Sequence, residues 1–318
     1  MHTRSLSLAF TLTWTFTTGA TALLSQDALH PTVPRLVAEA SIRSMDALNT
    51  NVYLPVTIQG HAATLLLGFG IDGGLSLTPG RLAQLGVTLP DSTRLDALTL
   101  GTTVLRHVAM RPWGRLRDGP PDLPPVVGVV GNQFLTQYDI VYDGPAHRVR
   151  LYDLPAHTST RPEGTHTAWL PPELPSASCT SILPLPEHNA GFAIQANGHA
   201  IPAILETMSS YTKMNMFAAK AMGLTQHSSE VHPVPADFWE RQDGYGHPVK
   251  WQATGIQLTL GTQHFTVVPI TIFPGLDVDR YSTPVPPILL LNPDDLRGQM
   301  LVMSNSAGQV CLGVPRGA

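Results

Sequence analysis

Short stretches in which apolar and polar residues alternate recur along the chain, and this two-residue period is typical of half-buried β-strands. Tyr53–Ile58 and Ala62–Leu67 flank a turn at Gly60 and predict a β-hairpin. Leu95–Leu100 and Val104–Met110 predict a second hairpin further along the chain. Proline and glycine are plentiful, with 29 and 27 residues. This composition favours many short strands joined by tight turns over a helical bundle.

A short helix interrupts the β pattern. Thr78 is a good N-cap residue, and Pro79 is well suited to the first helical position. Two leucines then give the segment an apolar side, and Gly86 ends it. A second helix of the same kind is predicted over Met216–Met222, directly before Gly223.

The chain contains an internal repeat. Gly60-His61-Ala62 and Gly198-His199-Ala200 each open a block that runs through an apolar strand and a small turn into the predicted helix. The closing glycines, Gly86 and Gly223, lie 26 and 25 residues after Gly60 and Gly198. The pentapeptide LTLGT also occurs twice, at Leu98–Thr102 and Leu258–Thr262. Two matched blocks in the same order indicate two copies of one β-rich lobe.

A further block helps to identify the lobe. Val126–Leu135 is an apolar run with turn glycines that leads into a short Phe-Leu helix, and Asp139–Asp143 and His147–Leu151 predict two closing strands. The repeated blocks run in the order strand, glycine turn, strand, small turn, apolar strand and helix. Together with this further block, they resemble the lobe of aspartic proteases, in particular the retropepsin-like kind found in bacterial secreted proteins. The resemblance covers most of the chain beyond its first segment. It implies an all-β fold of two retropepsin-like (acid protease) β-barrel lobes, related by the internal repeat and separated by a cleft.

The chain departs from this family at the catalytic triplet. The family carries an aspartate eight residues after the turn glycine, where this chain has Gly68 and Glu206. The two triplets are Gly68-Phe69-Gly70 and Glu206-Thr207-Met208, and neither is D-T-G. An aspartic protease needs two facing carboxylates that share one proton, and the first of them is missing here. Thr207 keeps the residue type that braces the opposite lobe, whereas Phe69 does not.

Asp72 offers a substitute acid, because Asp72-Gly73-Gly74 is an Asp-x-Gly turn. The spacing argues against it. Asp72 lies 14 residues before the helix-closing glycine of its copy, against 18 for Gly68 and 17 for Glu206. We therefore expect Asp72 to be a solvated turn residue and Glu206 to be a hydrogen-bonding remnant. An altered dyad of Glu206 with Asp72 is the alternative.

Composition limits the possible partners. The net charge is −4 and there is no basic patch, so nucleic acid is not expected to bind. His227, His232 and His247 lie in a long insertion, residues 226–250, at spacings of 5 and 15 that match no standard zinc pattern. We therefore expect no metal and no cofactor. The resemblance places a substrate-covering flap at this insertion.

The first segment has the features of a secretory signal peptide. It has a positive Arg4, an apolar stretch over Leu6–Phe16 and an A-x-A cleavage site at Ala20-Thr21-Ala22. The protein is therefore expected to be secreted or periplasmic. No later run reaches the roughly 18–20 apolar residues that a transmembrane segment needs. The predicted divisions are a signal peptide (1–22), a first lobe (23–154), a Pro-rich linker (155–177) and a second lobe (178–318).

The two cysteines, Cys179 and Cys311, lie at the start and the end of the second lobe. In an oxidising compartment they are a candidate disulfide, which would join the first and last strands of that lobe. Two buried free thiols are the alternative, because a sequence does not show whether the Cβ atoms are within reach.

Three functions are compatible with these features. The first is a secreted pseudoprotease with a degenerate dyad that binds an extended peptide or a protein in the cleft between the lobes. The second is an active aspartic endopeptidase that uses Glu206 and Asp72. The third is a structural envelope protein whose cleft is filled by side chains such as Phe69 and Met208.

Overall fold

In the part of the chain that the computed structural model describes, β-strands far outnumber helices, and the predicted all-β class is confirmed. The structure describes residues 33–44, 50–89, 93–114, 116–153, 168–185, 189–207, 211–235, 248–267, 269–273 and 286–317. All of them belong to one compact unit, residues 33–318.

The strands of the first half are β1 (Leu36–Ser44), β2 (Thr50–Ile58), β3 (His61–Leu67), β4 (Leu75–Leu77), β5 (Arg94–Leu100), β6 (Thr103–Pro112), β7 (Val126–Val130), β8 (Tyr138–Asp143) and β9 (Arg148–Asp153). Those of the second half are β10 (Ser178–Leu185), β11 (Asn189–Ala196), β12 (His199–Leu205), β13 (Lys213–Asn215), β14 (Val231–Pro233), β15 (Trp251–Ala253), β16 (Ile256–Leu260), β17 (Gln263–Val267), β18 (Ile270–Phe273), β19 (Leu289–Leu291), β20 (Met300–Ser304) and β21 (Gln309–Gly313). The helices are short: α1 (Pro79–Gln84), α2 (Asn132–Leu135), α3 (Met216–Ala221) and the 3-10 helix η3 (Pro293–Leu296).

The turn that opens each sequence repeat has the same backbone shape in both places. Gln59 and Gly60 have φ values of 49° and 89°, and Asn197 and Gly198 have 48° and 82°. Positive φ at both central residues is the geometry of the two-residue turns that match the twist of a β-hairpin. The flanking strands pair accordingly, β2 with β3 and β11 with β12.

The strand pairings of the first half recur in the second. In the first half β3 is parallel to β7, β7 is antiparallel to β4, and β4 is parallel to β6. In the second half β12 is parallel to β19, β19 is antiparallel to β13, and β13 is parallel to β18. The pairs β2–β5 and β5–β6 likewise have counterparts in β11–β16 and β16–β17.

Among the described residues, one strand of the second half has no counterpart in the first. Strand β14 lies inside the insertion at 226–250 and pairs antiparallel with β15, which directly follows the insertion and pairs with β18. The insertion therefore adds a strand beside the sheet at the point where the resemblance placed a flap.

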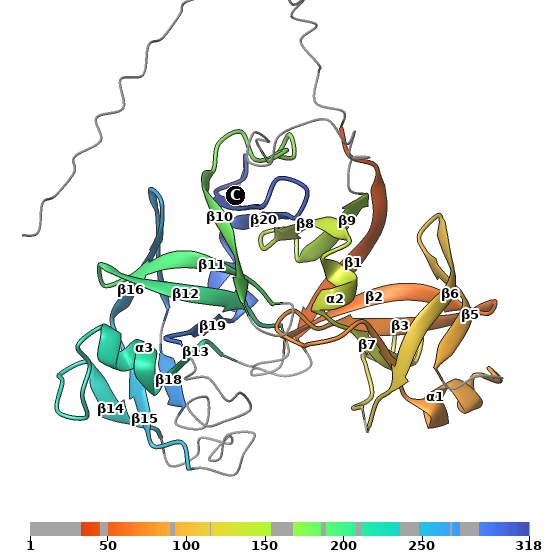
Figure 1. Ribbon diagram of the computed structural model, residues 1–318, viewed down its shortest axis with the longest axis horizontal. Helices are drawn as coiled ribbons and strands as arrows, with labels where there is room; N and C mark the ends of the chain where they lie inside the picture. Colours follow the sequence, from red (N-terminus) through yellow and green to blue (C-terminus); the bar gives the residue numbers. More distant parts are fainter. Residues whose placement is uncertain are drawn as a thin grey trace, which may run out of the picture. The chain divides into compact units, whose positions relative to one another are not determined.

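A single sheet connects the two halves. Its strands lie in the order β1, β9, β8, β20, β21 and β10, and the antiparallel pair β8–β20 joins first-half to second-half residues. Figure 1 shows β8, β9 and β1 continuing from β20 and β10. Cys179 of β10 is directly opposite Cys311 of β21 in this sheet.

Strand β3 buries both of its faces. Ala63, Leu65 and Leu67 pack in the main core, whereas Leu66 joins a separate apolar cluster on the other face. The other buried members of this second cluster are Tyr53, Leu116, Val126 and Val129. Because successive side chains of a strand alternate between faces, β3 links the two clusters at the point where the first triplet begins.

The predicted domain boundaries fall partly outside the described residues, which begin at residue 33 and omit 154–167. The signal peptide at 1–22 and the first part of the linker are therefore not described. In the second part of the linker, Ala168 and Leu174 are buried against Tyr152 and Val302 of the shared sheet. Over the described part of the chain, no helix is long and apolar enough to cross a membrane.

Candidate functional site

The two sequence triplets meet in space. Strand β3 ends at Leu67 and β12 ends at Leu205, so each triplet begins where a buried strand stops. The Thr207 hydroxyl accepts a hydrogen bond from the Phe69 main-chain N–H at 3.0 Å and donates one to the carbonyl of Leu67. The N–H of Thr207 donates to the Phe69 carbonyl at 3.3 Å. A threonine of the second half thus holds the turn of the first half.

Phe69 does not return this interaction. Its side chain is 2% exposed and belongs to the main core. A phenyl ring has no hydrogen-bonding group, so the side-chain hydrogen bonds between the two turns come from Thr207. The contact between the triplets is therefore one-sided.

Gly68 occupies the position where the resemblance expects the first catalytic acid. It is buried, and its N–H donates to the carbonyl of Val130 at 2.8 Å. A Cβ atom at Gly68 would lie 2.9 Å from both Ile71 Cδ1 and Val129 Cγ1. Real Cβ atoms do not approach neighbours so closely, so these side chains would have to move to admit any substituent. A carboxylate at this position would therefore require Ile71 and Val129 to shift.

Glu206 is partly buried, and its main-chain N–H donates to the carbonyl of Leu291 at 2.9 Å. Its carboxylate packs against the main chain of Gly70, where a Cβ atom would lie 2.8 Å from Oε2. Gly70 has a φ of 84°, which favours glycine, and its N–H donates to Asn132 Oδ1 at 3.3 Å. The contact between the Glu206 carboxylate and the first turn therefore depends on the missing side chain of Gly70.

Asp72 is held through its main chain. Its carbonyl accepts a hydrogen bond from Arg111 Nη2 at 2.5 Å, and Arg111 Nε donates to Ser76 Oγ at 2.9 Å. The Asp72 carboxylate is partly exposed and makes no hydrogen bond or ion pair within the described portion of the chain. Met208, the third residue of the second triplet, lies outside the described residues.

Sequence reasoning did not single out Asn132 or Arg111. Asn132 is 6% exposed, begins α2 and binds the turn at Gly70. Arg111 lies so close to Gly73 that a Cβ there would be 2.7 Å from its guanidinium. The sequence contains one signal for Asn132. Asn132 follows β7, the strand that pairs with β3, and Asn292 follows the corresponding strand of the second half, which pairs with β12.

A second acidic group lies close to the second turn. Burial raises the pKa of the Asp295 carboxyl to about 6; the Thr212 hydroxyl opposes the shift and the charge of Asp294 adds to it. The Thr212 hydroxyl donates to Asp295 and accepts from the N–H of Asn292 at 2.8 Å. These bonds tie η3 to the segment that follows Glu206 and Thr207.

Cys179 and Cys311 form a disulfide with a Cα–Cα distance of 4.0 Å. Cys311 is fully buried, whereas Cys179 is exposed at the start of the shared sheet. No group of three or more His, Cys, Asp or Glu side chains that could hold a metal ion occurs among the described residues.

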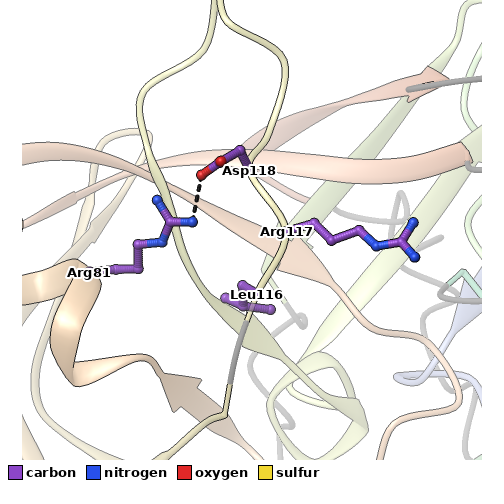
Figure 2. Close-up of a pocket in the computed structure, with 4 residues that line it drawn as sticks. All are labelled: Arg81, Leu116, Arg117 and Asp118. Carbon is purple, nitrogen blue, oxygen red and sulfur yellow. Dashed lines mark ion pairs between the residues drawn. The ribbon is translucent and has the colours of Figure 1, made fainter.

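A pocket of about 590 Å³ opens on the first half and is lined by Arg81, Leu116, Arg117 and Asp118. Figure 2 shows Asp118 facing Arg81, with an ion pair of 2.5 Å, while the side chain of Arg117 extends away from this pair. Arg81 comes from α1, and the other residues come from the segment that follows β6.

Comparison with known proteins gave matches among solved structures. Neither a protein-family model nor a curated protein matches the sequence. The chain is similar to an aspartic proteinase from Irpex lacteus, with 11% identity and a TM-score of 0.48, covering 88% of this chain and 98% of that one. It is also similar to Basic 7S globulin from soybean, with 9% identity and a TM-score of 0.49, covering 88% and 95%. Similarity at this level identifies neither a family nor an activity.

Proposed function

We propose that the protein is a catalytically inactive, aspartic-protease-like protein in which two retropepsin-like lobes, related by duplication, bind an extended peptide or a protein segment. The matching strand pairings of the two halves support the duplication. The hydrogen bonds between Thr207 and the turn at Phe69 support two lobes that face each other at their triplets. The Cys179–Cys311 disulfide supports the predicted export, because disulfides persist in oxidising compartments.

The space around Gly68 carries the inactive part of the proposal. Peptide hydrolysis by this type of site needs one ionised and one neutral carboxyl group within hydrogen-bond reach of the same water. Glu206 supplies one carboxyl group. At Gly68 the second is absent, and Ile71 and Val129 close the space that it would need.

The altered dyad is the competing function, and no contact of Asp72 favours it. A pair of carboxyl groups that shares a proton has to lie within hydrogen-bond distance, directly or through one water. In the described structure the Asp72 carboxylate has no hydrogen-bond partner, and its main chain is held by Arg111. The filled-cleft function rests on Phe69, which is buried in the main core, and on Met208, which lies outside the described residues.

The proposal is tested by incubating the full chain with an unfolded protein and a random peptide library from about pH 3 to about pH 7. Glu206→Gln and Asp72→Asn are the matched variants, because each removes one charge with little change in size. We expect no new cleavage products from any of the three proteins, and we expect the immobilised wild-type protein to enrich peptides from the library.

Two results would overturn the proposal. Cleavage by the wild-type protein that disappears in Glu206→Gln would show a working peptidase. If the folded protein enriches no peptide from the library, the proposed binding function is wrong.

A further inference from the structure

Residues 113–125, described apart from residue 115, cross one face of the first half and are called the strap here. Main-chain hydrogen bonds tie its two ends to the sheet. The N–H of Trp113 donates to the carbonyl of Leu77 at 2.7 Å, and the N–H of Thr64 donates to the carbonyl of Pro125 at 2.9 Å. The Thr64 hydroxyl adds a bond to the carbonyl of Pro124 at 2.8 Å.

Between these ends the strap lies on the second apolar cluster. Leu116 is 8% exposed and packs with Tyr53, Leu66, Val126 and Val129, and Leu123 and Trp113 pack at the edge of the same cluster. At Gly119 the strap backbone touches this face directly, since a Cβ there would be 2.5 Å from Val126 Cγ2. The face borders the first triplet, because Val129 is also one of the two side chains that enclose Gly68.

The strap also forms two ion pairs with the residues beneath it. Asp118 pairs with Arg81 at 2.5 Å and Asp122 pairs with Arg43 at 2.9 Å. The aspartate side chains are 82% and 57% exposed, so both pairs are accessible to competing carboxylates. Exposed ion pairs of this kind are weak and exchange readily with solvent and with other ions.

Strap leucines line three pockets of the first half. Leu116 lines the pocket of Figure 2 and an adjoining pocket of about 310 Å³ that reaches Thr78 and Gln84. Leu123 lines a third pocket of about 330 Å³, together with Tyr53 and Thr64. The two strap leucines thus each border open space.

We propose that the strap acts as an intramolecular ligand of the groove that it covers. The same groove binds an extended peptide from another molecule, with two aliphatic residues and acidic residues between them. The strap itself defines this chemistry: Leu116 and Leu123 fill the apolar face, and Asp118 and Asp122 meet the two arginines. The inference rests on the proposed peptide-binding function. The inference adds the class of peptide that binds. It also adds that the strap, by occupying the groove, regulates the access of this peptide.

The test uses the full chain and a fluorescein-labelled peptide with the sequence of residues 112–125, followed by fluorescence anisotropy. In the Leu116→Ser/Leu123→Ser variant the strap is loosened, and we expect it to bind the peptide at least about tenfold more tightly than wild type. Adding Arg81→Gln and Arg43→Gln to the loosened variant should weaken binding by about tenfold. Arg106→Gln removes one positive charge from an exposed position of β6 that lines none of these three pockets, and it should bind as wild type does.

A second, milder variant tests the inference if the leucine variant does not fold. Asp118→Asn/Asp122→Asn keeps both leucines and removes both ion pairs, and it should bind the peptide about threefold more tightly than wild type. Circular dichroism and urea unfolding establish that each variant is folded.

Folded variants of both kinds that gain no affinity would overturn the inference. If wild-type protein still enriched library peptides in that case, the proposed function would stand without the strap. Equal binding of a scrambled peptide to the loosened variant would also overturn the inference, since the groove would then have no preference for the strap chemistry.

Discussion

The side-chain hydroxyl of Thr207 lies 3.0 Å from the main-chain nitrogen of Phe69, although the two residues are 138 positions apart in the chain. The same hydroxyl donates to the carbonyl of Leu67, so one side chain satisfies a donor and an acceptor of the opposite turn. Thr207 is 1% exposed, and water cannot replace these bonds without opening the contact. At the triplets the two halves are thus joined by the side chain and the main chain of Thr207, and further away by the shared sheet.

Replacing Thr207 by valine should destabilise the protein. The change keeps the shape but leaves the Phe69 N–H and the Leu67 carbonyl without their side-chain partner. Because a buried unsatisfied polar group costs about 1–3 kcal/mol, we expect the free energy of unfolding to fall by about 2–4 kcal/mol. Thr207→Ser keeps the hydroxyl and should lose less than about 1 kcal/mol. Urea unfolding measures both, and equal losses in the two variants would contradict the role of the hydroxyl.

Adding a methyl group at Gly68 should also be costly. The new Cβ of Gly68→Ala would lie 2.9 Å from Ile71 and Val129, and overpacking of this kind costs about 1–3 kcal/mol. Gly80 is a matched control, because it lies in α1 with nothing within 4 Å of its absent Cβ. Gly80→Ala should be neutral or stabilise by up to about 1 kcal/mol. Thermal unfolding in which both variants behave alike would refute the packing described around Gly68.

Asp295 should make stability depend on pH. Its pKa is raised from 3.8 to about 6 in the folded protein, so the folded state holds a proton that the unfolded state has lost between these values. Stability is therefore highest below about pH 4 for this group and falls by about 3 kcal/mol as the pH rises through about 6. Asp295→Asn, which mimics the protonated form, should lose less stability than wild type over this range. Parallel profiles of unfolding free energy against pH for the two proteins would contradict the raised pKa of Asp295.

The disulfide should stabilise the protein, because it closes a long loop in the unfolded chain. Cys179 and Cys311 are 132 residues apart, and breaking native disulfides typically costs about 2–5 kcal/mol. We expect a reductant to lower the urea midpoint of wild type and to leave the Cys179→Ala/Cys311→Ala variant unchanged. A wild-type midpoint that is insensitive to complete reduction, verified by thiol counting, would contradict this expectation.

Local patterns were sufficient to predict much of the fold. The alternation in Tyr53–Ile58 and Ala62–Leu67 predicted the hairpin β2–β3, and Pro79 marked the first residue of α1. Thr78 is the N-cap residue as predicted, but its hydroxyl donates to the carbonyl of Gly114 in the strap instead of capping the helix. Tertiary contacts thus changed the role of a correctly placed residue.

The site was harder to predict, because its contacts join distant parts of the sequence. The motif comparison identified Gly68 and Glu206 as the positions of interest. It did not show that Gly70 receives the Glu206 carboxylate or that Asn132 holds the same turn. The raised pKa of Asp295 depends on burial of its carboxyl group by tertiary contacts, which a local pattern does not contain.

The most direct test of the central claim is a calorimetric titration with a peptide that mimics the tetrahedral intermediate of peptide hydrolysis. A matched peptide with an ordinary peptide bond serves as the reference, at about pH 4.5. A working carboxyl pair binds such mimics at least about 100-fold more tightly than the substrate. Because Gly68 contributes no carboxyl group, we predict affinities within about threefold of each other. A preference of about 100-fold or more for the mimic, lost in Glu206→Gln, would contradict the account.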